Sequence, residues 1–110
     1  MTPIEINANK QRFIDCCHQY IQRDGLDKIL AYLEKSDFYE APSSASYHLN
    51  EKGGLCKHSL NVFHTALKLR KHILEESIAS GESPFTEVPS EESVAISALF
   101  HDICKVKLYH

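Results

Sequence analysis

The longest stretch of regular hydrophobic periodicity, residues 55–79, constrains the fold more than any other feature of the chain. Its apolar side chains recur at helical spacing and form two adjoining strips instead of one. The first strip holds Leu55, Val62, Ala66, Leu69 and Ile73, and the second holds Leu60, Phe63, Leu67 and Leu74. A helix with two apolar strips packs against other elements on more than one side. The segment therefore predicts a long helix inside a bundle, with a solvated face at Lys68, Arg70, Lys71 and His72.

Two helices are predicted before this segment. The first is expected over residues 9–24, with Asn7 or Asn9 as its N-cap and Gly25 at its end. The second, shorter helix starts near Asp24 or Asp27, and its apolar residues are Leu26, Ile29, Leu30 and Leu33. Residues 1–35 are thus expected to form a helical hairpin.

A fourth helix is predicted after the N-cap Ser90, with Glu91 and Glu92 in its first turn, and it is expected to run through the mostly apolar residues 94–100 and to end at His101-Asp102. This segment is almost entirely apolar, which favours a place in the core. The Ser-, Pro- and Gly-rich stretch 36–54 shows no apolar period and is expected to be an ordered loop. Since no segment alternates like a strand, the predicted class is all-α. The 110 residues are enough for one small domain.

Composition and charge exclude several classes of protein. The formal net charge of −3 argues against a protein held to nucleic acid by bulk electrostatics, although nucleic acid stays open as a substrate. No stretch approaches the roughly 18 apolar residues of a membrane span, so no membrane partner is expected. The first residues lack the apolar core of a signal peptide, and a cytoplasmic location is the default expectation. The four cysteines form no CxxC pair and are expected to be reduced thiols that pack as small hydrophobes.

The chemistry concentrates in the doublet His101-Asp102, which ends the apolar segment ISALFHD. A carboxylate carried into the interior on an apolar helix must be paired or bound to a metal. His58 lies on the buried side of the long helix, after Gly53 and Gly54, where glycine permits a positive φ or a close backbone approach. Two helices could therefore bring His58, His101 and Asp102 together as a mixed nitrogen and oxygen metal site. The alternative for the doublet is an ordinary helix C-terminus with a favourable histidine.

These residues resemble a known family. The segments GGLCKHSLNVFHTALKL and SALFHDICKVKLY resemble the HD superfamily of metal-dependent phosphohydrolases, over residues 46–108. The resemblance matches His58 to the first histidine of the family pattern, His101 and Asp102 to its doublet, and Lys105 to a lysine three positions after the aspartate. It implies a helical bundle of the HD-domain type, with residues 46–110 as the metal-binding core segment.

The resemblance also implies a function and a set of roles. The function is hydrolysis of a nucleotide, phosphodiester or phosphomonoester, assisted by one or two divalent ions, with Mn, Fe, Zn, Ni and Mg all open. Such an ion makes hydroxide available near neutral pH. Asp102 and Lys105 are the predicted catalytic residues, and Lys105 would stabilise charge on the phosphate. His48 and Lys105 are the predicted substrate-binding residues, with an ordinary loop residue and a solvated lysine as their alternatives.

One element of the family pattern has no counterpart in the 110 residues. The pattern implies a further ligating aspartate well downstream, and no aspartate follows Asp102. The chain is therefore expected to hold the N-terminal part of such a domain. A non-catalytic module that binds a nucleotide or a protein stays open as the alternative function, as does a homo-oligomer that covers exposed helix faces.

Overall fold

The computed structural model describes residues 1–42, 51–79, 81 and 89–103. Over these residues it contains four helices and no strand: α1 (Pro3–Tyr20), α2 (Leu26–Lys35), α3 (Gly54–Ala79) and α4 (Glu91–Leu99). The all-α prediction is confirmed. The predicted residues His48, Cys104, Lys105 and His110 lie outside the described residues.

Helix α1 begins six residues earlier than predicted, at Pro3 instead of residue 9, and it ends at Tyr20 instead of residue 24. Thr2 is the N-cap, not Asn7 or Asn9. Its hydroxyl accepts from the Glu5 backbone N–H, and the Glu5 carboxylate accepts from the Thr2 backbone N–H. This reciprocal pair is a capping box, and Pro3 supplies a φ suited to the first turn. These local hydrogen bonds outweigh the weak helical periodicity before Asn9.

Helix α2 has the predicted extent, but Gly25 has a different role from the one expected. Gly25 directly precedes α2 as its N-cap, with a φ of 95°. It does not end α1, whose C-cap is Ile21, a buried residue. A left-handed conformation is easy for glycine. The chain therefore turns between the two helices at Gly25, after α1 has already ended.

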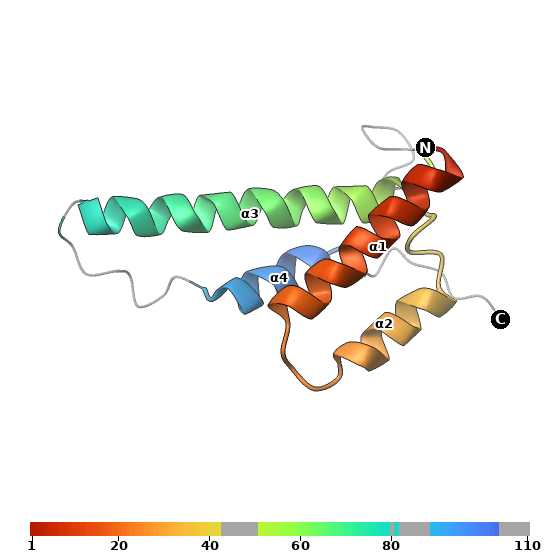
Figure 1. The fold of residues 1–110 in the computed structure, drawn as a ribbon, viewed down its shortest axis with the longest axis horizontal. Helices are drawn as coiled ribbons and strands as arrows, with labels where there is room; N and C mark the ends of the chain where they lie inside the picture. Colours follow the sequence, from red (N-terminus) through yellow and green to blue (C-terminus); the bar gives the residue numbers. More distant parts are fainter. Residues whose placement is uncertain (43–50, 80, 82–88, 104–110) are drawn as a thin grey trace.

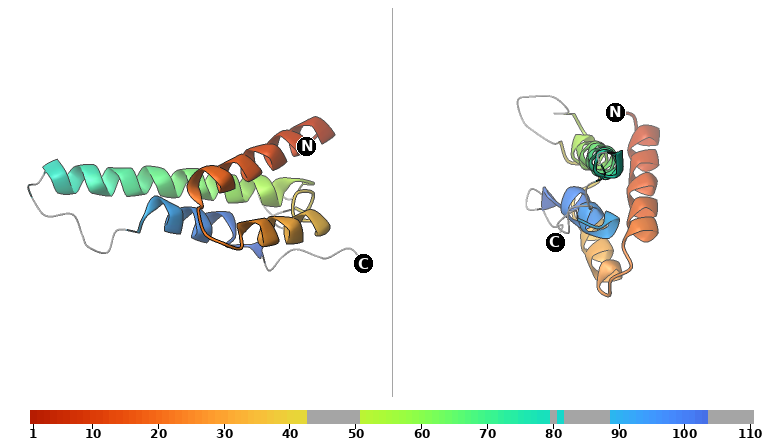
Figure 2. Two further views of the ribbon diagram at one scale, coloured as in Figure 1. Left: turned by 60° about the horizontal axis from the view of Figure 1, so that its bottom comes forward. Right: turned by 90° about the vertical axis from the view of Figure 1, so that its left-hand side faces the viewer.

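Helices α3 and α4 lie side by side and run in opposite directions (Figure 1). As a result the first turns of α3 lie beside the last turn of α4. Helix α1 packs on both of them, and the C-terminal part of α3 extends beyond α1 and α4 (Figure 1; Figure 2, left). Because α3 and α4 are antiparallel, polar residues at the start of α3 lie near those that follow α4.

The start of α3 is held against α1 through Gly53. Its φ is 84°, and a Cβ at this position would lie 2.8 Å from Cγ1 of Ile6 and 3.0 Å from Sδ of Met1. A Cβ this close would displace the Ile6 and Met1 side chains, and the positive φ also favours glycine here. The predicted need for glycine before α3 is confirmed at Gly53.

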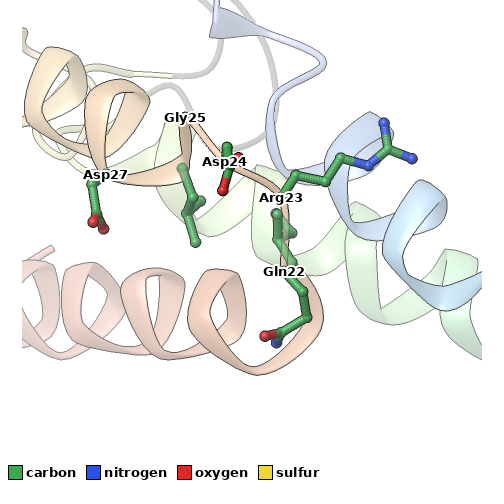
Figure 3. Close-up of a pocket in the computed structure, with 7 residues that line it drawn as sticks. Gln22, Arg23, Asp24, Gly25 and Asp27 are labelled. Atoms are coloured by element: carbon green, nitrogen blue, oxygen red, sulfur yellow. The ribbon is translucent and has the colours of Figure 1, made fainter.

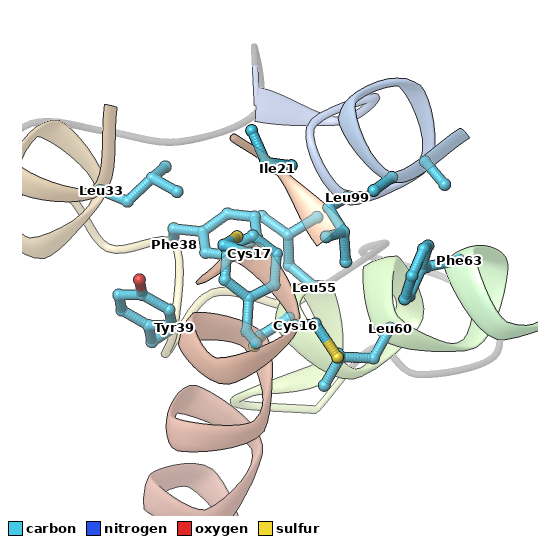
Figure 4. Packing of buried hydrophobic residues seen from close by; sticks show 14 of the residues in the cluster. Cys16, Cys17, Ile21, Leu33, Phe38, Tyr39, Leu55, Leu60, Phe63 and Leu99 are labelled. Carbon is cyan, nitrogen blue, oxygen red and sulfur yellow. The ribbon is translucent and has the colours of Figure 1, made fainter. Parts of the chain in front are cut away.

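The core is built around Phe13 of α1, which is fully buried. Figure 4 shows other side chains of the same core, among them Phe38, Tyr39 and Leu55. The Phe13 ring centroid lies 4.9 Å from that of Phe38 and 5.9 Å from those of Tyr39 and Phe100. The remaining buried hydrophobic residues include Leu33, Leu55, Leu60, Phe63, Ala95 and Leu99. All four helices therefore contribute to one core. No described helix is both long enough and apolar enough to cross a bilayer.

Cys16, Cys17 and Cys56 are free and buried, as predicted for thiols that pack as hydrophobes. Burial raises the pKa of both the Cys17 and the Cys56 thiol to about 12. We expect both to resist alkylation by iodoacetamide near pH 8 and to react rapidly in concentrated urea, because only the thiolate is nucleophilic. Mass spectrometry of the labelled peptides measures this. Rapid labelling of either thiol in the native protein would contradict the packing.

The same pKa shifts predict a loss of stability in alkali. The unfolded thiols ionise from their ordinary value of 9.0, while the folded thiols keep their protons until about 12. The folded state therefore binds more protons in this interval, and the free energy of unfolding falls as the pH rises through it. Urea unfolding at a series of pH values tests this, and a Cys17→Ala/Cys56→Ala variant should show a shallower decline.

Ser90 caps α4 as predicted, with its hydroxyl accepting from the Ser93 backbone N–H at 3.1 Å. Ser90→Ala should reduce the free energy of unfolding by about 1 kcal/mol, because that N–H loses its acceptor. Ser90→Asp should keep most of the stability, since aspartate also caps helices. Ser97→Ala, an exposed change on the same helix, is the control in urea denaturation. An equal loss in both alanine variants would show that the cap is unimportant.

Candidate metal centre

His58, His101 and Asp102 come together at the end of the bundle where α3 begins and α4 ends. His58 lies in the second turn of α3, and α4 ends at Leu99, two residues before His101. The backbone turns after Leu99, with the Phe100 N–H donating to Ile96 and the Ile103 N–H donating to Phe100. The antiparallel packing of α3 and α4 thus joins residues 43 positions apart.

The ligand atoms of these three residues all lie within 4.8 Å of one another. Oδ2 of Asp102 is 3.0 Å from Nε2 of His101 and 3.6 Å from Nε2 of His58. Two donors bound at about 2.1 Å to one ion lie about 3.0 Å apart at a right angle and about 3.4 Å apart at a tetrahedral angle. The two separations to Asp102 are close to these values, and the third lies within 4.8 Å. The three residues could therefore hold a divalent cation.

A hydrogen bond sets the orientation of His101. Its Nδ1 lies 2.6 Å from the backbone carbonyl of Ala98. A carbonyl only accepts, so Nδ1 must carry the proton, and in the neutral ring Nε2 then presents a lone pair. Nε2 lies 3.0 Å from Oδ2 of Asp102, a separation at which a proton or a bound cation can lie between the two atoms. Backbone carbonyls orient metal-binding histidines in the same way.

The hydrophobic core anchors the doublet. Leu99 is fully buried, and the Phe100 ring lies edge-on against Phe13 at 5.9 Å. These two side chains precede His101 directly, so they fix the backbone from which the doublet projects. Sequence reasoning missed this anchor and the Ala98 carbonyl. The apolar residues before the doublet were the available signal, whereas a backbone acceptor leaves no mark in the sequence.

The predicted burial of the site is wrong. The side chains of His58, His101 and Asp102 are 36%, 32% and 16% exposed. Because α4 ends at Leu99, the doublet lies on the turn that leaves the core and not inside it. The three residues form a rim site with one side open to solvent. A site for a substrate that must enter from solution needs this access.

The other sequence candidates do not join this group. His18, His64 and His72 are exposed on α1 and α3. Within the described parts of the chain, no second group of histidine, cysteine and acidic side chains has metal-ligand spacing. The predicted roles of His48 and Lys105 fall outside the described residues and stay predictions.

A surface pocket of about 310 Å³ lies apart from the triad, at the turn between α1 and α2 (Figure 3). Residues 21–27 line it, so a single turn of backbone makes the whole wall. Its acidic residues, Asp24 and Asp27, do not belong to the metal-ligand group. We assign this pocket no ligand.

Comparisons of the chain with models of protein families, with curated proteins and with solved structures find no match.

Proposed function

We propose that this protein is a metal-dependent phosphohydrolase of the HD type, acting on a nucleotide or another phosphate ester. The convergence of His58, His101 and Asp102 carries the proposal. Two imidazoles and one carboxylate suit Mn, Fe, Zn, Ni or Mg, and three protein ligands leave coordination positions for water and substrate. When bound, such a cation lowers the pKa of a coordinated water and polarises a phosphoryl oxygen.

The chain's own residues prepare the site for this reaction. The Ala98 carbonyl holds His101 so that Nε2 faces Asp102. The partly exposed edges of His58 and His101 leave room for a phosphate group from solution. Lys105, three positions after Asp102, is proposed to neutralise charge on that phosphate. In the hydrolysis itself the water oxygen bonds to phosphorus, the ester P–O bond breaks, and the departing alcohol takes a proton.

The test compares the wild type with His101→Ala and, as a matched control, with His18→Ala. His18 is exposed on α1 and lies outside the triad. Elemental analysis after equilibration with Mn²⁺ measures the bound metal, and bis(p-nitrophenyl) phosphate and p-nitrophenyl phosphate report hydrolysis. We expect near-stoichiometric metal and measurable turnover in the wild type and the control, and neither in His101→Ala.

Two outcomes would count against the proposal. If His101→Ala keeps both metal and turnover, the triad is not the site. If the wild type binds metal but hydrolyses no phosphate ester, the alternative function gains support, namely a non-catalytic module that binds a nucleotide or a protein.

A further inference from the structure

Helix α3 carries no acidic residue between Gly54 and Leu74, although acidic residues outnumber lysine and arginine in the whole chain, 15 to 12. Over the same residues it carries Lys57, Lys68, Arg70 and Lys71. The part of α3 from residue 54 to residue 74 is therefore positively charged, although the net charge of the whole chain is −3. This helix also supplies His58 to the candidate metal centre.

The exposed side chains of α3 form a stripe that starts at the metal centre. Asn61, Thr65, Lys68 and His72 follow His58 at intervals of three and four residues, so they share one face of the helix with it. We call these four residues the donor stripe, because each can donate a hydrogen bond to an anion. All four are exposed.

Charged and apolar neighbours flank the donor stripe. Lys57, His64 and Lys71 lie on one side of it, and all three are exposed. Leu69 lies on the other side and is 58% exposed. Arg70 lies on a different side of α3, where it is half-buried and its Nε donates to the Pro89 carbonyl at 2.7 Å.

The positive charge along α3 ends near Lys71 and His72. Lys71 and His72 are each followed one turn later by an acidic partner, with Lys71 Nζ 3.9 Å from Glu75 and His72 Nε2 3.2 Å from Glu76. A polyanion is favoured up to these residues and repelled beyond them. From His58 to Lys68 the helix rises about 15 Å. That length spans only a few phosphates of a nucleic acid strand.

We propose that the donor stripe binds a single-stranded polynucleotide and presents one of its phosphodiesters to the metal centre. This inference rests on the proposed function, since it names the substrate class of the same site. A strand offers phosphates to the donors and to Lys57, and an apolar surface on its bases to Leu69. Positive charge that follows the phosphate backbone is a usual means of single-strand binding. The acidic remainder of the chain disfavours wrapping by a long duplex, so the contact is short and local.

The binding test uses fluorescein-labelled oligothymidylate and oligouridylate, each about twelve nucleotides long. Fluorescence anisotropy in EDTA, which prevents cleavage, gives Kd at several salt concentrations. The variant is Lys68→Gln/Lys71→Gln, and the matched control is Lys28→Gln/Lys35→Gln, which removes the same charge from exposed positions of α2. We expect the α3 variant to bind about tenfold more weakly and to lower the log–log salt slope by about 1.4, the value for two lost contacts to a single strand.

The outcomes separate this inference from the proposed function. His101→Ala should keep oligonucleotide binding in EDTA while losing all hydrolysis. If no ester is hydrolysed but the two lysines still control binding, the stripe stands and the enzyme proposal fails. If bis(p-nitrophenyl) phosphate is hydrolysed but the wild type binds neither oligonucleotide at low salt, or the α2 control weakens binding equally, the stripe proposal is overturned. A preference between the two oligonucleotides identifies DNA or RNA as the substrate.

Discussion

Asp102→Ala should abolish the thermal stabilisation that a divalent cation gives to the wild-type protein. A cation present at about 100 times its Kd stabilises the folded state by about 2.7 kcal/mol, which raises the Tm of a domain of this size by about 10 °C. Oδ2 of Asp102 lies within 3.6 Å of both imidazole nitrogens, so its removal deletes the charged donor of the triad. Differential scanning fluorimetry with and without Mn²⁺ measures the shift.

Asp27→Ala is the control for this experiment, because Asp27 is an exposed carboxylate on α2 outside the triad. It should keep the full Mn²⁺-dependent shift, and EDTA should remove that shift in the wild type and the control alike. An undiminished shift in Asp102→Ala would place the cation elsewhere on the chain. The measurement needs no substrate, so it tests the metal centre independently of the enzymatic proposal.

Phe13→Ala should reduce the free energy of unfolding by about 3–5 kcal/mol. The fully buried ring contacts Phe38, Tyr39 and Phe100, and its removal leaves a cavity among three aromatic rings. Domains of this size are stable by about 5–15 kcal/mol in total, so the variant should be partly unfolded at 37 °C. Urea denaturation followed by circular dichroism measures the loss.

Two further variants show whether the loss comes from the cavity. Phe13→Leu keeps most of the buried volume and should lose considerably less stability than the alanine variant. Ile4→Ala removes a side chain that is 82% exposed on the same helix and should change stability by less than about 0.5 kcal/mol. Because Phe100 precedes His101, Phe13→Ala should also weaken Mn²⁺ binding. A loss below about 1 kcal/mol would contradict the central place of Phe13 in the core.

The helices were predictable where their signals are local. The cap at Ser90, the long helix α3 and the extent of α2 depend on neighbouring residues, and the structure contains all three. The first apolar strip of α3 was wrong at Leu69, which is 58% exposed, because burial depends on which elements pack against the helix. The start of α1 was wrong by six residues, since a capping box at Thr2 outweighs the poor periodicity that follows it. The role of Gly25 was also wrong, because the end of α1 is set by burial of Ile21, which depends on contacts distant in the sequence.

The sequence alone determined the helical class, the reduced state expected of the buried thiols, and the residue types that would meet at a metal. Those properties follow from periodicity, spacing and side-chain chemistry, which can be read directly from the amino-acid sequence. Only the tertiary structure decided that His58 and Asp102 meet, that the site lies at the rim, and that His101 is oriented by the Ala98 carbonyl. The reason is physical. Distances between side chains on different helices depend on how the core packs, and one turn of backbone after Leu99 carries the doublet from the interior to the surface.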